Sequence, residues 1–331
     1  MAEETPATGP TIKTAMSAYI DSVSLSRSAN TTRTYRNGLE VFQEVLLDHH
    51  LDPAQTPVTG LKEEAISWLA TRLKDSAPTT ERLYLTAAAT FYEYVAAENL
   101  AAVNLPRIRL LIRQRARRPG QRLPQFPRDA IEQIVEHMLA LNEVGEEDEV
   151  KRLRDLRDRA FLITLADTGL RVHEACALRR GDVDWLEGRA IIIGKGNKQA
   201  VVRFSQRSLR ALRDYLGARA RLDGSSGRPL ASLPLFTRHD KGAGKKLKPM
   251  TTATGRNIVS EWVEKILGPD AVGTVTPHSF RHYFVTRVLQ SSGNLKLAQE
   301  LARHSNIAVT QRYAHLSDDE LDQGYYEAFE R

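Results

Sequence analysis

The stretch LARHSNIAVTQRYAHLS, residues 301–317, holds four side chains that can act on a phosphate: His304, Arg312, Tyr313 and His315. A phenol has an unperturbed pKa of about 10 and becomes a nucleophile near neutral pH only when a base or nearby cations assist it. A tyrosine among cations is suited to attack phosphorus. It is also common on protein surfaces, so this stretch alone leaves both interpretations open.

A second stretch, TGLRVHEACAL, contains an arginine and a carboxylate at helical spacing. Gly169 can end one helix in a left-handed conformation, and Arg171 then opens the next helix. Glu174 lies three residues later on the same face, where it can hold the guanidinium in one orientation and make it a fork for phosphate. An ordinary surface ion pair has the same spacing. His173 points to another face and is expected to be exposed.

A third stretch, TPHSFRHYFVT, predicts an anion site at the start of a helix. Thr276 is a plausible N-cap and Pro277 a plausible first helical residue. His278 and Arg281 then lie on one face of the first turn, where the helix amides and the positive end of the helix dipole favour an anion.

The GKGNK stretch, residues 194–198, lacks the spacing of an ATP-binding phosphate loop. It fits a hairpin tip that projects Lys195 and Lys198 towards a DNA groove, where Lys195 could protonate a departing oxygen. A soluble turn would look the same.

The spacing of His278 and His282 raises the possibility of zinc, but the zincin pattern requires a glutamate where Ser279 stands. No metal and no other cofactor is therefore expected, and His282 is expected to pack inside. Each site is ambiguous alone. Together, two arginines, two histidines, a lysine and a tyrosine make a complete metal-free set for phosphoryl transfer.

The elements that must position these residues are mainly helices. Apolar residues at three- and four-residue spacing predict about four helices in 11–105, separated by prolines. Residues 1–10 read as a flexible tail and 106–125 as a basic linker. Residues 126–331 predict a mainly helical domain with a small antiparallel sheet at 182–205. In this domain helices are expected at 128–142, 151–168, 172–179, 206–221, 253–267, 277–291, 295–303, 306–313 and 318–329.

The charge distribution favours a nucleic acid as partner. The 331-residue chain has a formal net charge of +6, and seven arginines with no acidic residue lie between Arg107 and Arg122. Such a block repels itself unless an anion accompanies it, and a phosphate backbone is the usual one; a solvated linker is the alternative. The single cysteine, Cys176, excludes a disulfide framework and fits a reducing cytoplasm. The candidate DNA contacts are Arg33, Arg36, Arg113, Arg115, Arg117, Arg118, Lys198 and Arg303.

With TGLRVHEACAL, GKGNK, HSFRH and ARHSNIAVTQRYAHLS in this order, the chain resembles the tyrosine recombinases, the phage integrase family that includes Xer and Cre. The resemblance implies a helical core-binding domain and a catalytic domain that together clamp DNA. It implies that Arg171 and Arg281 hold the scissile phosphate and that Tyr313 is the nucleophile. Lys195 would be the general acid, with His278 and His304 assisting.

The resemblance also implies a site-specific recombinase that works without metal or ATP, as a homotetramer on two double-stranded DNA sites and weakly associated without DNA. A cytoplasmic, nucleoid-associated protein is expected, with no membrane contact, and the lack of an added N-terminal domain favours a simple Xer- or Cre-like system. Two positions depart from the family pattern, Arg303 where glycine is usual and Phe280 where leucine is usual. Arg303 leaves the role of His304 open. A type IB topoisomerase-like enzyme and a noncatalytic DNA-binding regulator are the alternatives.

Overall fold

The computed structural model describes residues 9–117, 127–141, 148–193, 199–240, 247–304 and 306–311. The predictions for Arg118, Lys195, Lys198 and Tyr313, for most of the tail and for the helix at 318–329 concern residues outside these ranges. The chain divides into two compact units, Met1–Gln121 and Arg122–Arg331. The point of division falls inside the predicted linker.

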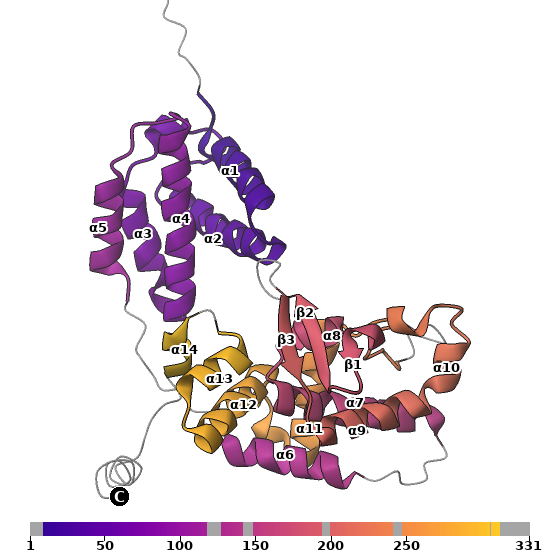
Figure 1. The fold of residues 1–331 in the computed structure, drawn as a ribbon. Coiled ribbons are helices and arrows are strands. Elements are labelled where there is room, and N and C mark those ends of the chain that lie inside the picture. The colour runs from indigo at the N-terminus through magenta and orange to yellow at the C-terminus, as the bar shows by residue number, and fades with distance from the viewer. Residues whose placement is uncertain are drawn as a thin grey trace, which may run out of the picture. The chain divides into compact units, whose positions relative to one another are not determined.

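The first unit is a helical bundle, drawn in indigo to purple in Figure 1. The four helices predicted in 11–105 are confirmed, and hydroxyl N-caps begin two of them: the side chain of Thr11 accepts from the amide of Thr14, and that of Ser28 from the amide of Thr31. The helices are α1 (Ile12–Ser26), α2 (Ala29–Asp48), α3 (Glu64–Arg72), α4 (Pro78–Ala97) and α5 (Leu105–Arg115).

Helix α5 corrects the first part of the predicted linker, because residues 106–115 are helical. Asn104 caps this helix by accepting from the amide of Arg107 at 3.0 Å, and Pro106 is tolerated in the first turn. Ile108 is 1% exposed, and the helix packs on α3 and α4. The many arginines obscured an apolar spacing that belongs to the first unit.

The arginine block also finds its counter-ions partly within the protein. Glu81 is buried in α4 with a side chain 1% exposed, and it binds both Lys74 and the guanidinium of Arg117. Arg113 and Arg115 remain exposed. Three of the arginines pair with carboxylates of the same unit: Arg107 with Glu64, Arg109 with Glu93 and Arg117 with Glu81.

The second unit is mainly helical and is drawn from magenta to yellow in Figure 1. Its central helix is α7 (Glu149–Thr168), which is buried along most of its length and contacts α6, α9 and α12. Its other helices are α6 (Arg128–Ala140), α8 (Val172–Ala177), α9 (Gln206–Ala218), α10 (Ala220–Gly224), α11 (Thr252–Leu267), α12 (Pro277–Ser292), α13 (Leu295–Ala302) and α14 (Ile307–Gln311).

The predicted antiparallel sheet is confirmed. Its strands β1 (Val183–Asp184), β2 (Arg189–Ile193) and β3 (Gln199–Arg203) lie in that order. Ile193 pairs with Gln199, so β2 and β3 are the arms of a hairpin. A mainly α fold with one small sheet is therefore what the sequence predicted and what the structure has.

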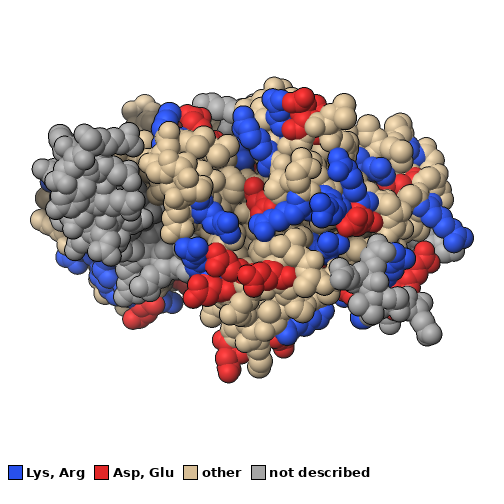
Figure 2. Space-filling view, turned by 60° about the horizontal axis from the view of Figure 1, so that its bottom comes forward, with Lys and Arg blue, Asp and Glu red and all other residues tan. Residues whose placement is uncertain are grey.

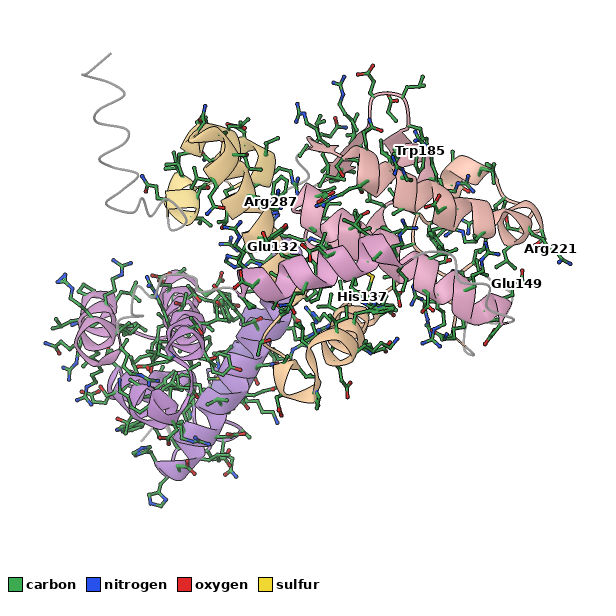
Figure 3. The ribbon with its side chains drawn as sticks, turned by 90° about the horizontal axis from the view of Figure 1, so that it is seen from below. Glu132, His137, Glu149, Trp185, Arg221 and Arg287 are labelled. Atoms are coloured by element: carbon green, nitrogen blue, oxygen red, sulfur yellow. The ribbon has the colours of Figure 1, made fainter. Side chains whose placement is uncertain are left out.

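Helix α12 is joined to the rest of its unit by polar contacts as well as by its core face. Arg128 of α6 donates to the side chain of Gln290 at 3.1 Å, and Arg287 lies 4.0 Å from the carboxylate of Glu132. Figure 3 shows the side chains of Glu132 and Arg287 next to each other, from α6 and α12. These contacts lie at the end of α12 remote from His278 and Arg281.

The face of the protein in Figure 2 carries basic and acidic side chains interspersed, so it is not a surface of one charge sign. Among the described residues, no helix has the length and apolar character needed to cross a membrane.

Candidate active site

The site begins at the turn between α7 and α8. Gly169 ends α7 with φ 58° and ψ 22°, the left-handed conformation predicted for it. A Cβ atom here would lie 2.4 Å from Cδ1 of Phe284, so the close approach of α12 also requires glycine. The turn places Arg171 at the N-cap of α8, directly beside the start of α12.

Glu174 orients Arg171, as the spacing predicted. One carboxylate oxygen accepts from Nη1 of Arg171 at 2.9 Å and the other from its backbone amide at 2.9 Å. The side chain of Glu174 is 3% exposed, whereas that of Arg171 is 40% exposed. Burial by itself raises the pKa of Glu174, but the amide of Arg171 and the cations of Arg303 and Arg171 lower that pKa below its ordinary value. The carboxylate is therefore charged, and the guanidinium it holds is turned to solvent.

Arg281 approaches the same turn from α12. Thr276 caps this helix and Pro277 is its first residue, as predicted. Arg281 is 3% exposed; its Nη1 donates to the carbonyl oxygen of Gly169 at 2.6 Å and its Nη2 donates to the carbonyl oxygen of Ala302. This one side chain connects the α7–α8 turn, α12 and the end of α13.

Arg171, His278 and Arg281 line one cavity of about 460 Å³. Burial, followed by the charges of Arg281 and Arg171, lowers the pKa of His278. At neutral pH Arg171 and Arg281 thus present fixed cations to the cavity beside the neutral imidazole of His278. Such a set can bind one phosphodiester and accept a hydrogen bond or a proton beside it.

His304 follows α13 and is half-buried. Its Nδ1 lies 2.9 Å from Oγ1 of Thr310 in α14. Burial lowers its pKa to about 4, and Arg281, Arg171, His282 and Arg303 lower it in the same direction. The imidazole is therefore neutral at physiological pH. Arg281 donates to the carbonyl oxygen of Ala302, two residues before His304, so the segment that carries His304 packs against Arg281.

His282 is half-buried, one turn after His278. The two imidazole rings lie edge to face with centroids 4.3 Å apart. Burial and the neighbouring His278 lower the pKa of His282 to about 4. The ring of His282 therefore packs against that of His278, in line with the predicted packing role. His173 is exposed, as predicted, and Cys176 is buried, 5% exposed.

Four of the six predicted catalytic residues can thus be placed, and they come together: Arg171, His278, Arg281 and His304. Lys195 and Tyr313 lie outside the described residues, so their roles stay predictions. Arg256 of α11 also lines the cavity and was missed from the sequence. The sequence offered one hint of this position, because Arg256 follows Gly255. Gly255 has no side chain, which lets α11 approach Val172 closely.

The predicted DNA contacts differ in accessibility. Arg33, Arg36, Arg113 and Arg115 are exposed on the first unit. The other two in the described residues are not presented to solvent in the same way. Arg117 is held by Glu81 and donates to the carbonyl oxygen of Leu73, and Arg303 has a side chain only 11% exposed. Those contacts argue for structural roles of Arg117 and Arg303.

The cavity that Arg171, Arg256 and Arg281 line in this mainly helical unit can bind an anionic phosphate group. A family model described as the phage integrase family matches residues 128–320, more than half of the chain, and the chain belongs to this family.

The chain is also similar along its length to curated relatives. The tyrosine recombinase XerC of Myxococcus xanthus is 28% identical over 306 residues, which is 92% of this chain and 93% of the relative. The tyrosine recombinase XerC of Pelobacter propionicus is 35% identical over 173 residues, 52% of each chain.

Two solved structures support the fold. The site-specific recombinase XerH bound to a palindromic difH substrate matches with a TM-score of 0.67 at 18% identity, over 94% of this chain and 83% of that one. The Tn1549 transposon integrase in complex with transposon right end DNA matches with a TM-score of 0.64 at 19% identity, over 97% and 100%.

Proposed function

We propose that this protein is a site-specific DNA recombinase that cuts and rejoins DNA strands through a 3′-phosphotyrosine intermediate, without metal or ATP. The observation that carries the proposal is that Arg171 and Arg281, 110 residues apart in sequence, line one cavity together with His278. Membership of the phage integrase family and the similarity to tyrosine recombinases support it.

In the proposed reaction, the phenol oxygen of Tyr313 forms a bond to the scissile phosphorus and the bond from phosphorus to the 5′ oxygen breaks. Arg171 and Arg281 stabilise the charge that develops on the nonbridging oxygens, usually the largest contribution to such a step. Lys195 gives a proton to the leaving 5′ oxygen. The phosphodiester energy is kept in the phosphotyrosine bond, so that a 5′ hydroxyl can later reverse the step.

The histidines supply the proton acceptor. Because the pKa of His304 is lowered to about 4 and that of His278 is also lowered, both imidazoles are neutral near pH 7. A neutral imidazole can accept the phenol proton or a hydrogen bond from the phosphate region, whereas an imidazolium can only donate. We assign His278 and His304 to these assisting roles.

The partner is double-stranded DNA that carries a specific site, bound by the exposed arginines of the first unit and by Arg256 beside the cavity. Exchange between two sites requires two duplexes and four protomers, so the active form is a homotetramer that is weakly associated without DNA. Localisation in the cytoplasm with the nucleoid follows from this substrate.

The test is covalent capture of DNA. Wild-type protein first selects its site from fragments of its host's DNA, and a duplex of that site nicked next to the cleavage point then traps the cleaved state. We expect a protein–DNA adduct with the wild type and none with Tyr313→Phe. An adduct that persists in Tyr313→Phe contradicts the nucleophile assignment. With two sites on one substrate, recombinant junctions identify a recombinase, and relaxation alone identifies a topoisomerase-like enzyme.

A further inference from the structure

Arg303 has a backbone conformation that residues other than glycine seldom adopt. It ends α13 with φ 57° and ψ 43°, the left-handed region. Glycine, the residue that the family resemblance leads one to expect here, adopts this conformation without strain. An arginine in its place needs a compensating contact of its side chain.

The side chain of Arg303 turns inward to the α7–α8 turn. Its Nη2 donates to Oε2 of Glu174 at 3.2 Å and to the carbonyl oxygen of Gly169 at 3.3 Å, and its Nη1 donates to the carbonyl oxygen of Leu301 at 3.3 Å. The side chain is 11% exposed. This position is too enclosed for a residue whose task is to meet a DNA backbone directly.

Both acceptors are shared with the two arginines of the cavity. Glu174 accepts from Arg171 through its other oxygen, at 2.9 Å, while the carbonyl oxygen of Gly169 accepts from Arg281 at 2.6 Å. Arg303 therefore shares one hydrogen-bond acceptor with Arg171 and another with Arg281.

We propose that Arg303 is a positioning residue for the phosphate site: it compensates the charge of Glu174 and fixes the carbonyl of Gly169, so that Arg171 and Arg281 keep their geometry and their positive charge for the scissile phosphate. The proposal rests on the function proposed above. It replaces the expectation that Arg303 contacts DNA.

The net charge around the turn predicts how the loss of Arg303 would change the site. Three guanidiniums and one carboxylate, those of Arg171, Arg281, Arg303 and Glu174, leave two net positive charges around the turn. Without Arg303 one net positive charge remains, and the buried carboxylate of Glu174 then has only Arg171 as its ion-pair partner in this set. The stabilisation of a transition state with added charge on its oxygens then weakens.

The test uses the full-length protein with three substitutions. Arg303→Met keeps an unbranched apolar stem, shorter than that of arginine, and removes the charge. Arg303→Lys restores a cation, and Arg303→Gly removes both the charge and the backbone strain. Arg287→Met is the matched control, because Arg287 is an exposed arginine on α12 that pairs with Glu132 and does not line the cavity (Figure 3). The substrate is the nicked duplex of the site that the wild type selects.

We expect Arg303→Met to lower the single-turnover cleavage rate at saturating DNA by at least about tenfold, the scale of a misplaced phosphate ligand. DNA affinity and its salt slope stay near those of the wild type, and Arg303→Lys recovers part of the rate. Arg303→Gly cleaves as slowly as Arg303→Met although its melting temperature is equal to or above that of the wild type, which separates the loss of charge from a loss of folding. Arg287→Met cleaves at the wild-type rate.

A second substrate tests the electrostatic part. A methylphosphonate at the scissile position removes the negative charge that the arginines meet, so the ratio of wild-type to Arg303→Met rates becomes smaller on it. Equal cleavage rates of Arg303→Met and the wild type on the phosphodiester would overturn the proposal. A defect confined to DNA affinity, with the salt slope reduced by about one, would also overturn it and assign a direct DNA contact instead.

The adduct assay with the Tyr313→Phe variant distinguishes failure of the proposed function from failure of the proposed role of Arg303. When the wild type forms a Tyr313-dependent adduct and Arg303→Met forms it equally fast, only the role of Arg303 is refuted. When the wild type forms no adduct, the proposed function fails and the role of Arg303 falls with it.

Discussion

The guanidinium of Arg281 donates a hydrogen bond to the carbonyl oxygen of Gly169, 112 residues earlier in the chain, at 2.6 Å. This contact brings the start of α12 against the turn that opens α8. Arg281 therefore holds together the two segments that carry it and Arg171, the arginines that we propose bind the scissile phosphate. Changes in the turn are expected to affect stability and chemistry together.

We expect Gly169→Ala to be far more damaging than Gly293→Ala. Both glycines have nearly the same positive φ, 58° and 59°, so each alanine costs about 1–2 kcal/mol of backbone strain. Only at 169 does the added Cβ overlap Phe284, which costs about 1–3 kcal/mol more. Urea denaturation measures the difference, and the cleavage assay reports the displacement of Arg171. Equal stability of the two variants would show that the turn can relax away from α12.

The pH dependence of cleavage follows from the lowered pKa of His304. An ordinary histidine has a pKa of about 6.5, below which it is charged. In this protein burial and the nearby arginines lower that pKa to about 4, so the neutral imidazole persists as the pH falls from 8 to 5. We expect the acid limb of the rate of adduct formation, measured with DNA below its Kd, to lie below pH 5. His304→Gln should remove this limb, and an inflection near pH 6.5 in the wild type would contradict the assignment.

Glu81 is expected to stabilise the first unit. Its side chain is 1% exposed and holds both Lys74 and Arg117, so Glu81→Ala should cost about 2 kcal/mol through lost charged hydrogen bonds. Hydrogen exchange in α4 would then be about thirtyfold faster, at about 1.4 kcal/mol per factor of ten. Glu64→Ala is the control, because Glu64 is 48% exposed and its pair with Arg107 contributes at most about 1 kcal/mol. Similar hydrogen-exchange rates in the two variants would contradict the prediction that Glu81 stabilises the first unit.

Arg256 is expected to contact a phosphate next to the scissile one. Arg256→Ala should weaken DNA binding at every sequence tested and reduce the salt slope of the affinity by about one. Arg221→Ala is the control, because Arg221 is exposed on α10, which lies at the opposite edge of its unit from α12 and α13 (Figure 1). An unchanged salt slope for Arg256→Ala, measured from about 50 to 200 mM salt, would exclude the contact.

Interactions between residues close together in the chain could be predicted from the sequence. The cap at Thr276, the left-handed Gly169 and the pair of Arg171 with Glu174 each involve residues at most three positions apart, and all were found as predicted. Helix and strand periods are local for the same reason, since they depend on hydrogen bonds between near neighbours. The fold class followed from these periods.

Only the tertiary structure showed which helices pack together and which charged side chains meet. Nothing in the order of residues showed that α5 packs on α3, that Arg256 lines the cavity of Arg171 or that the cation of Arg303 turns inward to Glu174. Composition had suggested that residues of α5 belong to a linker and that Arg303 contacts DNA. Burial and pairing of charges depend on segments that lie far apart in the chain, from 36 residues for Glu81 and Arg117 to 129 residues for Glu174 and Arg303, and only packing brings such segments within hydrogen-bonding distance.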